Sequence, residues 1–96
     1  MAIPDESPDT VRARAESLVE NTGRIVGDLN RIRRQHGLTE QDVADRLGWD
    51  LEEVQWVGRY YEHPTLPQIR RYALAVGALI HVTIEEDPSF VKEATR

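Results

Sequence analysis

The sequence contains no cysteine, which excludes disulfide bonds, thiolate nucleophiles and cysteine metal ligands. It has no apolar run near the roughly 20 residues that span a bilayer. Basic residues are also few: 12 Lys and Arg stand against 17 Asp and Glu, for a net charge of −5. The chain as a whole is therefore not attracted to nucleic acid or anionic lipid. The opening MAIPDESPDT lacks the basic-then-apolar order of a signal peptide. We expect one soluble cytoplasmic domain with a thin core.

The sequence motifs of catalysis are missing as well. There is no nucleophile–base pairing, no glycine-rich phosphate loop and no paired-acid motif. The histidines His36, His63 and His81 do not have the spacing of metal ligands. We therefore expect no enzyme activity, no catalytic residue, no cofactor and no metal.

A long helix is predicted near the N-terminus, after a disordered leader at residues 1–7. Ser7 can cap it and Pro8 suits its first turn. The apolar spacing alternates four and three, which places one stripe on one helix face, made of Val11, Ala15, Leu18, Thr22, Ile25, Leu29 and Ile32. The helix is expected to run over residues 8–36 and to end at Gly37. Because Asn21, Thr22 and Gly23 are weak helix formers, two helices meeting there is an open alternative.

The N-terminal extension, residues 8–23, has two interpretations. It either folds over the core as an extension of the first helix, or forms an arm that grips a second subunit or a partner protein such as a toxin. The seven-residue repeat of its stripe is too short, and contains too much Ala and Thr, to indicate a coiled coil.

Two short helices are predicted next, over 39–47 and from 51 to about 60 or 61. Thr39 with Asp42 forms a capping box for the first, and Gly48 suits a left-handed turn. Asp50 is expected to cap the second, with Glu53 in the reciprocal position. The inward side chains are expected to be Val43, Leu47, Leu51, Val54 and Val57, with the small Ala44 where the helices cross.

A fourth helix is predicted over 66–76, capped by Thr65, with Ile69 and Tyr72 in the core and Gly77 at its end. The following ALIHVTIEE alternates apolar and polar residues, which is typical of a β-strand. One strand cannot pair its own backbone, and a twofold copy is the simplest partner. The expected homodimer contacts are Leu79, Ile80, Val82 and Ile84. Residues 87–96 form a tail.

The sequences RIRRQHGLTEQDVADRLG and HPTLPQIRRYALAVGALIHVTIEE, with Val54 and Val57 between them, resemble the Xre/Cro-type, phage-repressor-like helix-turn-helix family. The resemblance covers about two-thirds of the chain, and we delimit the domain as residues 24–86. The ending, RRYA followed by a glycine and an alternating strand, resembles the subgroup that includes antitoxins of toxin–antitoxin pairs.

The resemblance implies an all-α domain of four to five helices with one C-terminal strand, usually dimeric, that binds DNA as a transcription regulator or repressor. Its third helix would lie in the major groove. The residues that the resemblance places toward bases are Asp50, Leu51, Glu52, Gln55, Trp56 and Arg59, and those nearest the DNA backbone are Thr39, Glu40 and Gln41.

The charge of this surface departs from the family, which favours Gln, Ser, Thr and Arg in the groove. From Gly37 to Gly58 there are six acids and one base, Arg46. Lys and Arg normally supply most non-specific affinity for DNA. The nearby cations are Arg59 and, on flanking helices, Arg31, Arg33, Arg34, Arg70 and Arg71. The alternative function is a protein-interaction module on the same scaffold, in which Trp56 contacts a partner rather than packing on the Tyr60–Tyr61 loop.

Overall fold

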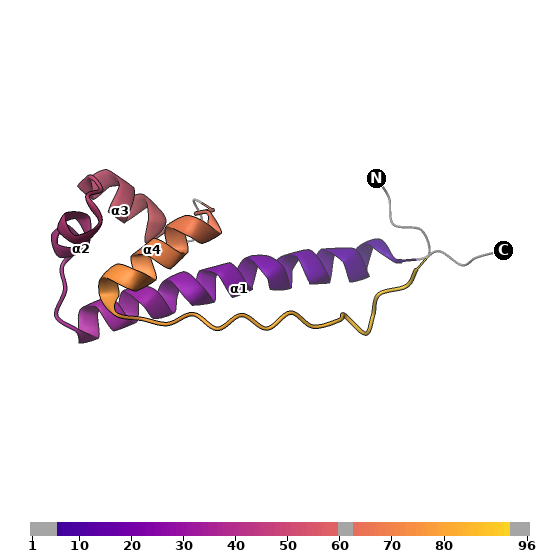
Figure 1. The fold of residues 1–96 in the computed structure, drawn as a ribbon. Coiled ribbons are helices and arrows are strands. Elements are labelled where there is room, and N and C mark those ends of the chain that lie inside the picture. Colours follow the sequence, from indigo (N-terminus) through magenta and orange to yellow (C-terminus); the bar gives the residue numbers. More distant parts are fainter. Residues whose placement is uncertain (1–5, 60–62, 93–96) are drawn as a thin grey trace.

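A computed structural model of the chain describes residues 6–59 and 63–92. Every regular element within these residues is a helix, so the all-α prediction is confirmed (Figure 1). Residues 1–5 of the predicted leader, residues 1–7, lie outside the described residues, as do residues 60 and 61. The third helix was predicted to reach residue 60 or 61, but it ends at Val57, so that predicted end is wrong: Gly58, a poor helix former, occupies the C-cap position. The helices are α1 (Pro8–Gln35), α2 (Glu40–Leu47), α3 (Leu51–Val57) and α4 (Leu66–Val76).

Helix α1 is continuous through Gly23, which decides the alternative that the sequence left open. A glycine inside a helix costs about 1 kcal/mol of helix stability relative to alanine. A helix of 28 residues still forms despite this cost. The Ser7 side chain accepts from the backbone N–H of Thr10, and Pro8 occupies the first turn, as predicted. The helix ends where expected: the N–H of Gly37 donates to the Arg34 carbonyl and Gly37 has a φ of 69°.

The two short helices begin and turn as the local sequence indicates, with one correction. Thr39 and Asp42 form the complete capping box of α2. Gly48 ends α2 in the left-handed region, at φ 68°, where a side chain would be strained. Asp50 occupies the N-cap of α3 but makes no side-chain capping hydrogen bond, so the predicted reciprocal pair with Glu53 is wrong.

Helix α4 has the predicted bounds and is the centre of the helical head, which we define as residues 25–80. Thr65 and Gln68 form its capping box. It packs against each of the other three helices. Gly77 ends it at φ 81°, and a Cβ there would lie 3.4 Å from the His36 ring. The His36 Nδ1–H donates to the Val76 carbonyl at 2.7 Å, which joins the ends of α1 and α4.

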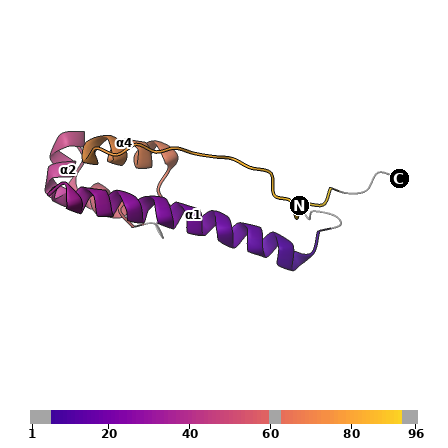
Figure 2. The same ribbon diagram turned by 90° about the horizontal axis from the view of Figure 1, so that it is seen from below.

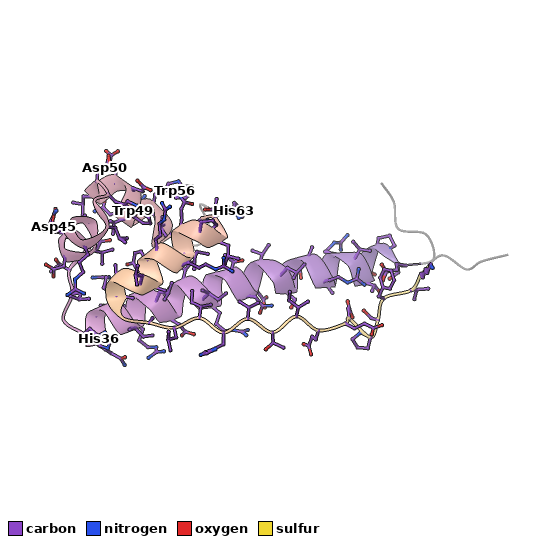
Figure 3. The ribbon with its side chains drawn as sticks, in the orientation of Figure 1. His36, Asp45, Trp49, Asp50, Trp56 and His63 are labelled. Atoms are coloured by element: carbon purple, nitrogen blue, oxygen red, sulfur yellow. The ribbon has the colours of Figure 1, made fainter. Side chains whose placement is uncertain are left out.

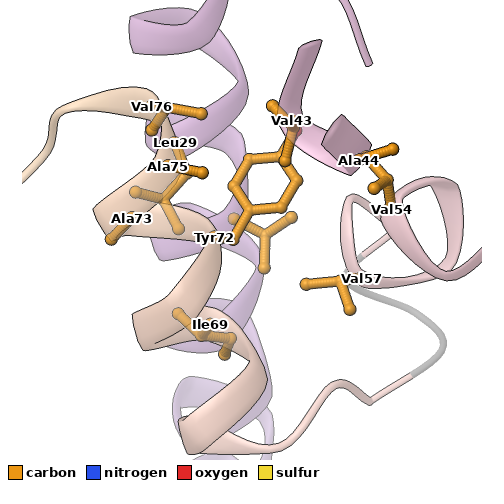
Figure 4. Close-up of a cluster of buried hydrophobic side chains, with 11 residues drawn as sticks. Leu29, Val43, Ala44, Val54, Val57, Ile69, Tyr72, Ala73, Ala75 and Val76 are labelled. Atoms are coloured by element: carbon orange, nitrogen blue, oxygen red, sulfur yellow. The ribbon is translucent and has the colours of Figure 1, made fainter. Parts of the chain in front are cut away.

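The core lies among the four helices, with the Tyr72 ring at its centre (Figure 4). Val43, Val54, Val57 and Val76 are fully buried around it, as the periodicity predicts for the first three. The other buried members are Val26, Leu29, Ala44, Ile69, Ala73 and Ala75. All are apolar, so burial of nonpolar surface holds the head together.

The first half of α1 does not fold over this core. Residues 8–24 project away from the head as an arm, and residues 81–91 run beside them (Figures 1 and 2). The molecule is therefore elongated, 58 × 22 × 18 Å. In the predicted apolar stripe, Leu29 is buried, whereas Leu18 is 62% exposed. The interpretation of residues 8–23 as an extension folded over the core is wrong, because α1 is one continuous helix that carries these residues past the head, and its core contacts begin at Ile25.

The C-terminal segment, residues 79–86, is extended but forms no strand with any described part of the chain. Its backbone groups make no hydrogen bond to another described residue. A β-ladder needs two chains side by side, and the described residues supply no second one. Within residues 6–59 and 63–92, no helix is long and apolar enough to cross a membrane.

Candidate nucleic-acid and protein interfaces

Helices α2 and α3 cross each other, and the inner face of each helix packs into the core. Val43 and Ala44 of α2, and Val54 and Val57 of α3, are buried. The left-handed Gly48 lets the chain reverse within three residues, and the N–H of Trp49 donates to the Ala44 carbonyl at 3.1 Å. Trp49, in the turn between the two helices, packs against the core. This pair carries all the residues that the sequence placed toward DNA.

The residues of α3 divide into exposed and half-buried ones. Asp50 and Glu52 are exposed, and Asp50 points away from the body of the head (Figure 3). Leu51, which was also expected to contribute to the core, is 39% exposed, so that part of the prediction is wrong. Gln55 and Trp56 are half-buried, and Trp56 packs against the core. The outer surface of α3 is therefore acidic with one leucine.

The residues at the start of α2 already have partners within the chain. The Thr39 hydroxyl accepts from the backbone N–H of Asp42, and Gln41 donates to Asp45 at 2.9 Å. The backbone N–H of Thr39 donates to the Asp42 carboxylate and holds its pKa below the usual value. Asp42 is thus a structural charge. Thr39 and Gln41 can contact another molecule only through their remaining hydrogen-bonding capacity.

The cations near this surface are unequally available. The side chain of Arg46, the only base between Gly37 and Gly58, donates to the Ala75 carbonyl at 3.0 Å and is thereby tied to α4. Arg33, one of the cations on the flanking helices, is half-buried and donates to the Leu38 carbonyl at 2.8 Å. Arg59, two residues after the end of α3, is exposed. Of these three, Arg59 is the cation best placed to meet a phosphate beside α3.

Asn30 is a structural residue that the sequence reasoning missed. Its amide donates to the Gly58 carbonyl at 3.0 Å and accepts from the Tyr72 hydroxyl at 2.8 Å. It therefore fixes the end of α3 to α1 and α4. Burial raises the pKa of Tyr72, and the charge of Arg33 opposes this shift only in part. The raised pKa keeps the phenol protonated, so that it can donate its hydrogen bond. The available signal was an asparagine, a poor helix former, beside the apolar stripe of a long helix.

The predicted dimer contacts lie on the C-terminal segment and differ in exposure. Leu79, Val82 and Ile84 are 85%, 59% and 93% exposed. Ile80 is half-buried and packs against the core, so it contributes to the head as well. Between this segment and the arm part of α1 lies a groove of about 1020 Å³, whose α1 side is formed by one face from Thr10 to Ile25.

An ion cluster closes the far end of this groove; we call it the clasp and define it as Glu6, Arg14, Asp87 and Phe90. The Arg14 guanidinium donates to both carboxylates, at 3.1 Å from Nη1 to Glu6 and 2.5 Å from Nε to Asp87. Its Cζ lies 5.5 Å from the centroid of the Phe90 ring. The Val91 N–H also donates to Glu6. The segment is thus held at both ends, by the core at Ile80 and by the clasp.

The clasp should titrate at unusually low pH. The hydrogen bond from Arg14, and then those from Ser89, lower the pKa of Asp87 from 3.8 to about 2. A depressed folded pKa means that the carboxylate stabilises the clasp above the unfolded pKa, and that this contribution is lost as pH falls from about 4 through about 2. We expect the carboxyl ¹³C shift of Asp87 to have its midpoint near 2, and Arg14→Gln to move it up toward 3.8. If Arg14→Gln left the titration midpoint of Asp87 unchanged, this would contradict the contact between Arg14 and Asp87 in the clasp.

Within the part of the chain that the structure describes, His, Asp and Glu side chains form no group of three that could hold a metal ion. Comparison of the chain with protein-family models, curated proteins and solved structures found no match.

Proposed function

We propose that this protein is a DNA-binding transcriptional regulator that acts as a homodimer, with α2 and α3 as its helix-turn-helix. The observation that carries the proposal is the α2–Gly48–α3 pair, whose second helix exposes Glu52 while Val54 and Val57 anchor it, with Arg59 exposed two residues after its end. In helix-turn-helix proteins the second helix of such a pair reads base edges in the major groove. The resemblance adds the role of an autorepressor or antitoxin of a small operon.

The charge of α3 determines what kind of DNA binding is expected. A glutamate can accept a hydrogen bond from cytosine N4, so Glu52 can specify a base. The negative charge of Glu52 cannot neutralise phosphates. Arg59 is the candidate beside α3 for that contact. Affinity per protomer is therefore low, and a dimer doubles the number of contacts. The C-terminal segment supplies the proposed dimer contact, because Leu79, Val82 and Ile84 are exposed and its backbone groups make no hydrogen bond to any described residue.

Fluorescence anisotropy with the DNA upstream of the protein's own gene tests this function. We expect binding at ~50 mM salt that weakens steeply toward ~200 mM, since weak electrostatic complexes are strongest at low salt. Arg59→Ala should reduce the slope of log K against log salt by about 1 per protomer. Arg12→Ala, which removes the same charge from the exposed arm, is the matched control and should leave the slope unchanged.

Failure to bind any operator-like fragment at ~50 mM salt would overturn DNA binding and favour the second candidate, a protein-interaction module. The acidic outer surface of α3 is the observation in favour of that candidate, since Arg46 is turned toward α4 and does not offset Glu52 and Glu53. A partner of this surface would be basic, and its capture would be lost in Glu52→Arg.

A further inference from the structure

A second, smaller groove lies on the head between α4 and the start of the C-terminal segment. Its volume is about 430 Å³, and its walls are largely apolar, made by Ala73, Leu74, Ala78, Leu79, Ile80 and Val82. Leu74 is 78% exposed, so this apolar surface is open to solvent. Arg70 lines the same groove and forms no salt bridge with any described residue. The groove thus combines apolar walls with one unpaired cation.

The adjoining segment presents a backbone edge with no partner. From Leu79 to Glu86 no described N–H or C=O group makes a hydrogen bond. The core holds one end of the segment and the clasp the other, so its extended form is already organised before binding. An exposed extended edge of this kind is completed by another extended chain. The occupant must also carry negative charge near Leu79 to match Arg70.

The same segment of a second copy meets both requirements. In an antiparallel pair whose twofold axis passes Val82, the two Val82 side chains lie opposite each other. On each side of the axis, Ile80 of one copy lies opposite Ile84 of the other. A centre at His81 places two histidines opposite each other and Ile84 opposite Ala78. A centre at Thr83 places Ile80 opposite Glu86. Only the register on Val82 pairs all the branched apolar residues of this face with one another.

This register also determines which residues of one copy lie opposite the acidic side chains of the other. It places Glu85 of each copy opposite Leu79 of the other, beside the groove that Arg70 lines. We propose that a second copy of this chain docks here in the Val82-centred register, with its Glu85 paired to Arg70, so that the dimer contains this ion pair twice. The inference rests on the proposed strand pairing and adds its register and its charge contact.

A charge exchange between two copies tests the proposal. Arg70→Glu and Glu85→Arg should each weaken the dimer about tenfold or more, because each turns two attractive contacts into two repulsive ones. An equimolar mixture of the two variants should dimerise again, since a heterodimer restores both opposite-charge pairs. Arg71→Glu is the matched control: Arg71 is exposed on the same helix but does not line the groove, and its dimer should be unaffected.

Sedimentation velocity at ~50 mM salt gives the dissociation constants, and circular dichroism checks that each variant folds. A wild-type chain that is monomeric at high concentration would overturn the strand pairing, and with it this inference. A dimer that Val82→Pro disrupts but Arg70→Glu leaves intact would overturn the register and ion pair alone. Dimerisation of the mixed variants, with each variant monomeric by itself, supports the proposal.

Discussion

Tyr72→Ala is expected to lower the free energy of unfolding by about 3–5 kcal/mol, the range for removing a buried aromatic ring. The Tyr72 ring is fully buried at the centre of the core, on the helix that packs against all three others. Such a domain has a free energy of unfolding of about 5–15 kcal/mol in total, so the substitution would remove a large share of its stability. Urea unfolding followed by circular dichroism measures the effect.

Tyr72→Phe is the matched control for that experiment. It keeps the ring and removes only the hydroxyl that donates to Asn30. We expect a cost of about 1–2 kcal/mol, because the Asn30 oxygen loses its donor in a half-buried position. If the alanine variant were no less stable than the phenylalanine variant, the ring would not be the centre of the core.

Val82→Pro is expected to convert the proposed dimer into monomers, with a dissociation constant raised by about 100-fold or more, equivalent to roughly 2.7 kcal/mol. Proline lacks the N–H that a strand contributes to its ladder, and its ring obstructs a paired neighbour. Val82 lies in the middle of the extended segment and is exposed, so the substitution leaves the helical head intact. Light scattering over a concentration series measures the change.

Val82→Ile is the control, since it keeps the N–H and the β-branched shape and should remain dimeric. A proline variant whose dimer is unchanged would place the contact elsewhere. The exposed Leu18 and Val19 on the arm part of α1 are then the next residues to substitute.

The candidate site was predictable where it depends on local sequence. The capping box at Thr39 and the left-handed Gly48 located the start of α2 and the turn that leads into α3. The exposure of individual side chains was less predictable. Leu51 was expected in the core and is exposed, whereas Arg33, named only as a nearby cation, is half-buried and bonded to the Leu38 carbonyl. Both lie at helix ends, where the surface that covers a side chain comes from another part of the chain.

The Asn30 contacts illustrate the same limit. Its partners, Gly58 and Tyr72, are 28 and 42 residues away, and nothing in the sequence near Asn30 specifies them. The clasp joins Arg14 to Asp87 across 73 residues and was likewise not predicted. Contacts of this range depend on how helices and segments are arranged, and the hydrophobic spacing of each element does not encode that arrangement.

The sequence by itself determined the helical regions, their starts and the ends of α1, α2 and α4, because caps, left-handed glycines and apolar spacing act within a few residues. It did not give the end of α3, which is Val57 rather than residue 60 or 61. It also determined that the segment after Gly77 is extended, through its alternation and β-branched side chains. Only the tertiary structure decided that α1 continues past the core as an arm, that Arg46 is tied to α4, and that the segment is held by the clasp. The reason is physical: local conformational preferences are short-ranged, whereas the burial and pairing of a side chain depend on surfaces supplied by distant residues.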